Sequence, residues 1–485
     1  MAEPFIGGAY VEFPKRERLR IANPATGDVV DTVPRVGPDE VDAAVQAAYK
    51  AFPAWRETPA AKRGELLAAA AGGVLQHVEE LALLLTSEQG KPLREARLEI
   101  RRFVHTLEYY AGLAKNLRGG YVPNLDDGAY GMILKQPVGV VGAIVPWNFP
   151  TTLLGNKLGP ALVAGNTIVA KPAETTPLTT LRIAGLMHAA GLPAGAFNVI
   201  TGSGSVAGKA LVEHPLVRKV AFTGSTPVGK DIMALAALDL KRVTLELGGS
   251  DPLIVCDDAD LDGAASAASV GRFFNCGQAC LAVKRLYVFD RVADAFIEKL
   301  TAKVARLKVG PGTLDGVTLG PMHSASERAR IEEQTAEAVA SGAKVLRGAR
   351  RPTGDLYARG HFYEPTLLLE PGHDSRVATE EVFGPVLPIW RVGDLEEALR
   401  LANRSVYGLG SSIWTRDLDR ASYAAERLEA GYTWINSPQK IYDELPFGGV
   451  KHSGFGKEHG IEALEFYMET KSVVVKRGGR DGDGS

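Results

Sequence analysis

A cysteine and a glutamate are the two side chains of this sequence that point most directly to covalent chemistry. Cys280 closes the run 273–280, and Glu246 lies upstream of it in the run 245–249. A thiolate attacks electrophilic carbon, and a carboxylate of suitable pKa activates a water that releases the product. Each residue alone also fits a structural role, because most free cysteines are buried and inert. The pair therefore predicts covalent catalysis only where other residues support it.

Two glycine-rich turns follow predicted strands and offer backbone N–H groups to a phosphate. Residues 201–208 fit the loose dinucleotide pattern G-x-G-x-x-A and contain Gly204. Residues 222–231 resemble a P-loop, but Asp231 stands where Ser or Thr must hold Mg²⁺, which excludes a nucleotide triphosphatase. Matches arise easily by chance in a chain with 54 glycines. Each turn is therefore either a phosphate site or a tight strand-to-helix connection.

Other catalytic and metal signatures are missing from the sequence. Cys276 and Cys280 form C-x-x-x-C, but no second pair completes a zinc site and no H-E-x-x-H occurs. No G-x-S-x-G supports a serine hydrolase. We therefore expect no metal. Cys276 either packs in the core or forms a reversible disulfide with Cys280, and packing is favoured.

Composition indicates a soluble globular protein with at least two domains. The chain has 485 residues, 45% of them hydrophobic and 23% charged. A formal net charge of −2 gives no electrostatic footprint for nucleic acid or an anionic membrane. Residues 1–5 lack the features of a signal peptide, and no apolar stretch reaches the ~20 residues of a membrane span. With only three cysteines, the sequence predicts a reducing compartment, the cytoplasm.

The elements that must position these residues fall into two α/β patterns. A helix is predicted from Pro38, with Val41, Val45, Ala48, Tyr49 and Phe52 on one face, and helical segments continue to about Leu113. A turn-rich stretch at 119–124 interrupts them. Apolar runs then alternate with helix-length segments such as 181–190, which predicts a parallel sheet whose ligands bind beyond the carboxyl ends of its strands. These runs are 138–145, 167–170, 197–200, 220–222 and 243–245.

The second pattern begins after Gly249 and ends in a tail. It has predicted strands at 253–255 and 286–289 and predicted helices at 293–307 and 325–340. The run 471–476 reads as a paired or protected edge strand, because it is β-branched and flanked by lysines. The Gly/Asp-rich residues 477–485 are expected to be disordered.

Seven motifs in this order make the combination specific, and together they resemble the NAD(P)-dependent aldehyde dehydrogenase superfamily over nearly the whole chain. The motifs are Pro146-Trp147-Asn148-Phe149-Pro150, Lys171-Pro172-Ala173-Glu174, Phe222-Thr223-Gly224-Ser225, Leu245-Glu246-Leu247-Gly248-Gly249, Gly277-Gln278-Ala279-Cys280, Glu381-Val382-Phe383-Gly384-Pro385 and Pro446-Phe447-Gly448-Gly449.

The resemblance implies an aldehyde dehydrogenase-like α/β fold with three parts. A Rossmann-like, parallel-sheet cofactor domain would comprise 1–118 and 137–247, and an α/β catalytic domain would comprise 248–448. A small β oligomerisation element and the tail would comprise 119–136 and 449–485. Members of the family assemble through this element, so the resemblance implies a homo-oligomer, either a dimer or a tetramer. Neither nucleic acid nor a membrane is an expected partner.

The resemblance also implies a catalytic sequence of steps. Cys280 would add to an aldehyde as a thiolate, which needs a lowered pKa, and give a thiohemiacetal. The side-chain amide of Asn148 and the backbone N–H of Cys280 would hold the oxyanion. Loss of hydride to the nicotinamide would leave a thioester, and Glu246 would activate the water that hydrolyses it.

For the cofactor, the resemblance implies NAD, with NADP possible. Glu174 and Lys171 would contact the adenosine ribose, where a carboxylate repels a 2′-phosphate and a lysine attracts it. Gly224 and Ser225 would take the pyrophosphate. Trp147 would line the cofactor channel, Glu381 would hold the nicotinamide ribose, and Phe383 would pack beside the ring. The expected cofactor-binding residues are Pro146, Trp147, Lys171, Glu174, Gly204, Phe222, Gly224, Ser225, Glu381 and Phe383.

The residue at position 156 narrows the class of aldehyde that the enzyme would accept but does not identify the substrate. Asn156 stands where succinic semialdehyde dehydrogenases carry an Arg that binds the distal carboxylate, and where some relatives carry an aromatic residue. Asn156 lacks the charge for an acidic semialdehyde and the ring for a quaternary ammonium group, which leaves a neutral aldehyde. One alternative is a CoA-acylating semialdehyde dehydrogenase, which the presence of Glu246 disfavours. The other is a non-catalytic ligand-binding protein on the same scaffold, which intact Asn148, Glu246 and Cys280 disfavour.

Overall fold

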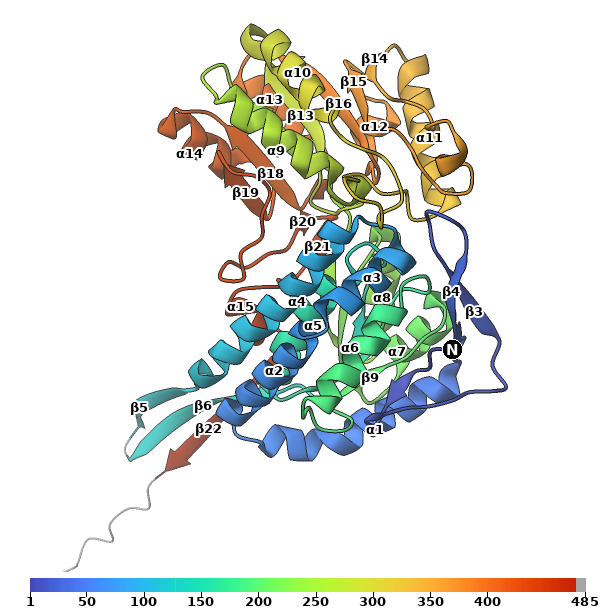
Figure 1. Cartoon of the computed structure of the whole chain (residues 1–485). Helices are drawn as coiled ribbons and strands as arrows, with labels where there is room; N and C mark the ends of the chain where they lie inside the picture. Colours follow the sequence, from blue (N-terminus) through green and yellow to red (C-terminus); the bar gives the residue numbers. More distant parts are fainter. Residues whose placement is uncertain (127, 477–485) are drawn as a thin grey trace, which may run out of the picture.

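Two large β-sheets with helices on both faces form most of the molecule (Figure 1). The computed structural model describes residues 1–126 and 128–476, so the predicted disorder of 477–485 concerns a segment outside the described residues. The first sheet has the strand order β2-β1-β9-β8-β7-β10-β11-β21. Its strands are β1 (Phe5–Ile6), β2 (Ala9–Tyr10), β7 (Val140–Ile144), β8 (Thr167–Lys171), β9 (Phe197–Val199), β10 (Val217–Thr223), β11 (Arg242–Glu246) and β21 (Gly454–Phe455).

The central strands of the first sheet are parallel and buried on both faces. Every residue of β7 and β8 is buried, because helices cover the sheet from either side. The chain runs outward from β7 to β8 and β9 and returns to β10 on the other side of β7. The strand order therefore reverses between β7 and β10, and the carboxyl ends of strands at such a point form a ligand-binding crevice.

Helices before and between these strands form the two covering layers. On one face the core is built from α2 to α6, and on the other from α1, α7 and α8. Helix α5 begins with Pro150 at its first turn and ends at Gly165, whose φ of +97° suits glycine. The helices are α1 (Pro38–Glu57), α2 (Ala60–Leu75), α3 (Val78–Gln89), α4 (Leu93–Leu113), α5 (Pro150–Ala164), α6 (Leu178–Ala189), α7 (Lys209–Glu213) and α8 (Thr226–Ala237).

The second sheet has the order β14-β15-β16-β13-β12-β18-β19, and all of its pairs are parallel except β14 with β15. Helices α9, α10 and α11 cover one face, and α13 and α14 cover the other. Its elements are β12 (Asp251–Val255), α9 (Leu261–Phe273), β13 (Val283–Phe289), α10 (Asp290–Val304), α11 (Ala325–Ala340), β14 (Lys344–Arg347), β15 (Thr366–Leu369), α12 (Arg376–Thr379), β16 (Val386–Val392), α13 (Leu395–Asn403), β18 (Gly410–Trp414), α14 (Leu418–Arg427) and β19 (Tyr432–Ile435).

A three-stranded antiparallel sheet extends away from the two large ones at the lower left of Figure 1. It consists of β5 (Gly120–Asp126), β6 (Ala129–Pro137) and β22 (Met468–Lys476), with β6 in the centre. Every residue of β5 is exposed. The other small elements are the hairpin β3 (Arg18–Ala22) with β4 (Val29–Pro34), the pair β17 (Tyr407–Gly408) with β20 (Val450–Lys451), and helix α15 (Glu462–Glu465).

The structure differs from the sequence predictions in several details. Tyr49 of α1 is exposed, whereas Ala44 and Trp55 belong to its buried face. The face that packs on the protein core is therefore rotated from the predicted one. Helix α10 begins at Asp290, earlier than predicted. Within residues 449–476, the described part of the predicted range, β21 pairs with β11 of the first sheet and β22 pairs with β6. The three-part domain division itself stays a prediction.

No single helix among the described residues is both long and apolar enough to cross a bilayer. Helices α2 and α3 reach that length and composition only as a pair, bent by 71°.

Candidate active site

The carboxyl ends of the first sheet face the amino ends of the second, and a cleft lies between them. Strands β7 and β10 end at this cleft, while β12, β13 and β16 begin beside it. Predicted site residues from both sheets therefore meet in one place. The cleft is lined by Pro146, Trp147, Asn148, Thr223, Gly224, Ser225, Leu247, Gly248, Cys280, Glu327, Arg330, Glu381 and Phe383.

Cys280 lies in the loop between α9 and β13 and opens onto the cleft. The residue is partly exposed, so the thiol is not sealed in the interior. Burial raises the pKa of the thiol to about 12. The positive charge of Lys284 lowers this pKa, whereas the negative charges of Glu246 and Glu381 raise it. The surroundings therefore keep Cys280 as a thiol. The lowered pKa expected from the sequence is not supplied by these side chains.

The loop before Cys280 has an uncommon backbone. Asn275, Cys276 and Gly277 all have positive φ angles, of 50°, 56° and 71°. A left-handed conformation costs a non-glycine residue roughly 1 kcal/mol, so the surrounding contacts must stabilise it. The Arg272 guanidinium donates to the Gly277 carbonyl at 2.6 Å, and Glu95 accepts the Asn275 N–H at 2.8 Å.

Cys276 belongs to the core of the second sheet rather than to the cleft. Its side chain is buried, and its Sγ lies 3.8 Å from the Met322 Sδ. Burial raises its pKa far above the ordinary value. These surroundings agree with the favoured packing role.

Asn148 is held at the end of β7 by contacts to its backbone and to its side chain. Its carbonyl accepts from the Lys91 Nζ at 2.7 Å and from the Asn275 Nδ2 at 2.8 Å. Its own Nδ2 donates to the Gln278 carbonyl at 3.1 Å, two residues before Cys280. Since an amide nitrogen carries two hydrogens, one of them remains for a ligand in the cleft.

Glu246, the last residue of β11, carries a buried carboxylate with no hydrogen-bond partner on either oxygen among the described residues. Burial, followed by the charge of Glu458, raises its pKa well above the ordinary value of a glutamate. A Cβ on Gly448 would lie 2.7 Å from the Oε1, so only glycine leaves room there. Buried polar atoms without partners are uncommon and need an explanation such as a bound water or a catalytic role.

Glu246 is not among the residues that line the cleft, whereas a second acidic side chain, Glu381, lines it and is held by two hydrogen bonds. Its Oε1 accepts from the Gly249 N–H at 3.0 Å and from the Lys284 Nζ. Phe383 meets the Trp147 ring edge-on, with centroids 5.6 Å apart. The other face of Trp147 stacks on His323 at 4.4 Å, and burial lowers the pKa of that histidine to about 4. The neutral imidazole is thus part of the support for the indole.

The start of α8 can hold an anion. Ser225 is its N-cap, is exposed and makes no capping bond with its hydroxyl. The first turn of a helix presents free N–H groups and the positive end of the helix dipole, which together suit a phosphate. A Cβ on Gly224 would lie 2.4 Å from the Phe222 ring, so the chain needs glycine at this turn. These features fit a dinucleotide pyrophosphate. The buried Phe222 ring packs against the turn at Gly224.

Lys171, Glu174 and Gly204 form a separate group beyond the carboxyl ends of β8 and β9, at the same edge of the sheet. The Lys171 Nζ donates to the carbonyls of Pro172 and Gly202, and burial lowers its pKa to about 8. Glu174 accepts the Gly204 N–H at 3.2 Å. None of the three lines the cleft around Cys280.

Several lining residues escaped sequence reasoning. Glu327 and Arg330 reach the cleft from α11, which the sequence predicted only as a helix. Nothing local marks them, because their place depends on how α11 packs. Thr223, Leu247 and Gly248 lay inside motifs that had been recognised, and their position directly after a strand or next to Glu246 could have identified them.

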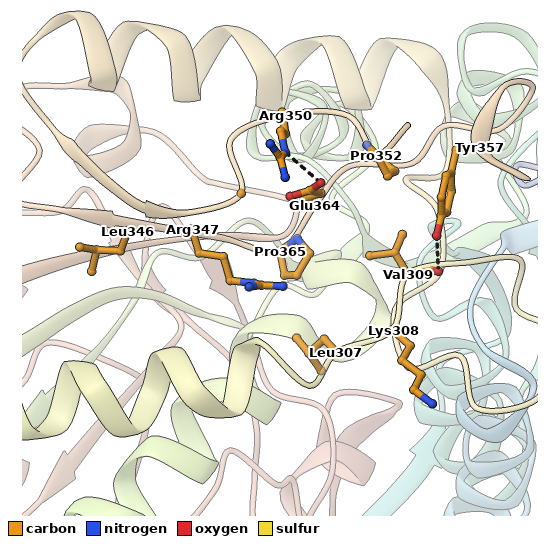
Figure 2. Close-up of a pocket in the computed structure, with 11 residues that line it drawn as sticks. Leu307, Lys308, Val309, Leu346, Arg347, Arg350, Pro352, Tyr357, Glu364 and Pro365 are labelled. Atoms are coloured by element: carbon orange, nitrogen blue, oxygen red, sulfur yellow. Dashed lines mark hydrogen bonds and ion pairs between the residues drawn. The ribbon is translucent and has the colours of Figure 1, made fainter. Parts of the chain in front are cut away.

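A larger hollow lies elsewhere in the second domain (Figure 2). It is lined by residues 307–309 and by residues between Leu346 and Pro365. Arg350 pairs with Glu364 at 3.0 Å, and the Tyr357 hydroxyl donates to the Val309 carbonyl at 3.2 Å. No predicted site residue lines this hollow. The described residues also contain no group of three or more His, Cys, Asp and Glu side chains that could hold a metal ion.

Comparison with known proteins assigns this arrangement to one family. A family model described as the aldehyde dehydrogenase family matches residues 10–473. A glutarate-semialdehyde dehydrogenase of Pseudomonas aeruginosa is 42% identical over 98% of this chain and 97% of its own. An NADP(+) succinate-semialdehyde dehydrogenase of Escherichia coli is 41% identical over 98% of this chain and 97% of its own.

Two further similarities bear on the ligands. A phenylacetaldehyde dehydrogenase of Pseudomonas fluorescens is 43% identical over 97% of this chain and 95% of its own. The crystal structure of PnpE in complex with nicotinamide adenine dinucleotide matches with a TM-score of 0.96 and 41% identity, covering 98% of this chain and 97% of that one.

Proposed function

This chain belongs to the aldehyde dehydrogenase family and oxidises an aldehyde to the carboxylic acid with NAD(P), and we propose that Cys280, Asn148 and Glu246 carry out the reaction. The single observation that supports this most strongly is the Glu246 carboxylate. It is buried and without a partner, yet close enough to the thiol to raise the pKa of Cys280. A carboxylate in that state is suited to hold and deprotonate a water.

The proposed reaction begins when the Cys280 thiol loses its proton to solvent and the thiolate bonds to the aldehyde carbon. The electron pair of the C=O double bond passes to the oxygen, which becomes the oxyanion of a thiohemiacetal. The free N–H of the Asn148 amide and the backbone N–H of Cys280 stabilise that charge. NAD(P), when bound, supplies a positively charged nicotinamide ring that favours the thiolate and accepts the hydride. The resulting thioester remains on Cys280. Glu246 then takes a proton from water, and the hydroxide displaces the thiolate to release the acid.

The cofactor would lie along the carboxyl edge of the first sheet. Ser225 and the first turn of α8 would bind its pyrophosphate, which the free cap and the Gly224 turn support. Trp147 and Phe383 would line the ring site, and Glu381, already oriented by Gly249 and Lys284, would bind the adjacent ribose. Pro146 lines the same cleft. Gly204 would contribute to the cofactor site indirectly, because its N–H donates to the Glu174 carboxylate and so orients it.

We propose that the enzyme prefers NAD to NADP. The Glu174 carboxylate, oriented by the Gly204 N–H, would bind ribose hydroxyls and repel a 2′-phosphate. Lys171, which could attract that phosphate, is buried and already donates to two backbone carbonyls. The NADP(+) relative from E. coli makes this a preference to be measured against both cofactors.

We propose a neutral aldehyde as the substrate, despite the semialdehyde names of two relatives. Cys280 and Leu281 pack against an apolar cluster that consists of Leu409, Trp434 and Phe447. The Asn156 amide donates to Glu458 at 3.0 Å, and it brings no positive charge for a distal carboxylate. The phenylacetaldehyde relative has a substrate name of the kind that this lining favours.

We propose that a second copy of the chain covers the three-stranded sheet in a homo-oligomer. Tyr121, Leu125 and Val474 are exposed on that sheet, and its outer strands β5 and β22 each leave an edge unpaired within the described chain. A stable active monomer in sedimentation would contradict the oligomer.

The three free cysteines support the cytoplasm as the compartment.

A panel of neutral and acidic aldehydes with NAD and NADP tests the proposal. NADH and free acid should form without CoA, with the highest kcat/KM for neutral aldehydes and NAD. NADH that appears only with CoA would favour the CoA-acylating alternative. The absence of NADH with every aldehyde would favour a non-catalytic ligand-binding protein.

A further inference from the structure

A buried ion pair lies outside the cleft but contacts the residues that carry Asn148. The Lys91 side chain is 0% exposed and that of Glu99 is 2% exposed, and the two form a salt bridge. Lys91 follows the turn at Gly90 that ends α3, and Glu99 lies on α4. Charges are costly to bury unless further hydrogen bonds satisfy them, so the additional partners of this pair show what it holds.

Those partners lie on both sides of Asn148. The Lys91 Nζ donates to the Asn148 carbonyl at 2.7 Å and lies 4.0 Å from the centre of the Phe149 ring. The Glu99 Oε1 accepts the N–H and the hydroxyl of Thr151, both at 2.9 Å, and the N–H of Thr152 at 3.3 Å. The carboxylate thus closes the amino end of α5, where the helix dipole favours a negative charge.

The same network reaches the loop of the nucleophile. The Asn275 Nδ2 shares the Asn148 carbonyl with Lys91, and the Asn275 N–H donates to Glu95 of α4. The Asn148 amide in turn donates to the Gln278 carbonyl. Helix α4 and the turn before it therefore fix the backbone of Asn148 in relation to the loop that ends at Cys280.

A similar carboxylate elsewhere provides a natural control. Glu88 of α3 accepts the Leu178 N–H at 2.7 Å, and the Thr179 N–H at 2.9 Å together with the Thr179 hydroxyl. It closes the amino end of α6 as Glu99 closes that of α5, and its side chain is equally buried. The start of α6 does not line the cleft. Loss of Glu88 is therefore expected to open the start of a helix in the same way, at a place that makes no hydrogen bond to Asn148 among the described contacts.

We propose that Lys91 and Glu99 are positioning residues that aim the Asn148 amide at the oxyanion formed at Cys280. The inference rests on the proposed role of Asn148. Neither residue touches the substrate or the cofactor; both act through the backbone on either side of Asn148. An error of about 1 Å in the position of a catalytic group can lower the rate about 100-fold.

A double-mutant cycle tests this coupling. Lys91→Met should lower kcat/KM for the aldehyde about 100-fold while the Kd for NAD stays within about twofold. In an Asn148→Ala background the same change should lower kcat/KM by no more than about threefold, because the group that Lys91 positions is already gone. General destabilisation would instead add to the Asn148→Ala effect in full.

Matched variants complete the test. Lys91→Met with Glu99→Gln removes both charges and replaces the single variant where that one fails to fold. Glu88→Gln should lower the melting temperature as Glu99→Gln does, but keep kcat/KM within about threefold of the unmodified enzyme. Additive effects of Lys91→Met and Asn148→Ala would overturn the positioning role alone. A fully active Asn148→Ala enzyme would overturn both this role and the oxyanion site on which it rests.

Discussion

The cleft at Cys280 and the larger hollow at Arg347 (Figure 2) are assembled from different amounts of the chain. The cleft draws residues from positions 146 to 383 and from both large sheets. The residues that line the hollow all lie within 307–365, in the part of the chain that forms the second sheet. Its Arg350 is already paired with Glu364. The Cys280 thiol lines the cleft, and the buried Glu246 carboxylate, which has no partner among the described residues, lies close to that thiol. The charged residues that line the hollow are Lys308, Arg347, Arg350 and Glu364.

The difference teaches that space alone does not identify a site. A nucleophile that lines a cleft, together with a buried carboxylate close enough to shift the pKa of that nucleophile, gives a reaction a place to occur. Fixed charges at an open surface cost little and perform no chemistry by themselves. Breaking one region and then the other should therefore have very unequal effects.

Replacement of the nucleophile should have the largest effect. Cys280→Ala removes the one thiol found among the described residues that line the cleft, so kcat should fall by at least about 10⁴-fold. Binding of NAD, measured by fluorescence titration, should stay within about twofold, because the cofactor residues are intact. Substantial residual turnover by the purified variant would show that the chemistry does not pass through this sulfur.

Replacement of the base should separate the two halves of the reaction. Glu246→Gln should give a burst of NADH stoichiometric with enzyme, followed by steady turnover about 10³-fold slower than that of the unmodified enzyme. Its melting temperature should not fall, because the carboxylate has no hydrogen-bond partner among the described residues. Slow chemistry from the first turnover would mean that Glu246 acts before the thioester forms.

The pH dependence of thioester hydrolysis should follow the same carboxylate. A base acts when it is deprotonated, and burial raises the pKa of Glu246 above the ordinary value of a glutamate. Hydrolysis should therefore accelerate about tenfold per pH unit below that raised pKa and level off above it. Single-turnover deacylation measured across pH gives the curve. In Glu246→Gln the rising limb should vanish, while any pH limb of the NADH burst remains.

Cofactor choice should change moderately. Glu174→Gln keeps an acceptor for the Gly204 N–H but removes the charge that repels a 2′-phosphate. Two like charges about 4 Å apart near a surface repel by at least about 1 kcal/mol, so the ratio of kcat/KM with NADP to that with NAD should rise about fivefold or more. An unchanged ratio would place the ribose away from Glu174.

The smallest effect should come from the larger hollow. Arg347→Ala removes a cation whose Nε has no partner among the described residues. The Nε is buried, so the substitution should affect stability more than activity; because Arg347 does not line the cleft, kcat/KM should stay within about twofold. A large loss would mean that the hollow communicates with the cleft and that the contrast between the two regions is wrong.

The sequence carried most of the fold, and it supplied the predicted reacting groups on which the proposed function rests. Strands such as β7 and β8 were evident because buried parallel strands are continuous apolar runs, and α11 was predicted with its observed bounds. The extent of α10 and the exposure of Tyr49 were missed, because both depend on how a helix rests on a sheet. Glu327 and Arg330 were missed for the same reason.

By itself, the sequence determined which residues can react and in which order the motifs follow one another, because side-chain chemistry and local periodicity are properties of the chain. Only the tertiary structure decided their state. The raised pKa of Cys280, the unpartnered carboxylate of Glu246 and the ion pair behind Asn148 arise from contacts between segments far apart in sequence. Burial and distance between such segments set these energies, and no local pattern encodes either quantity.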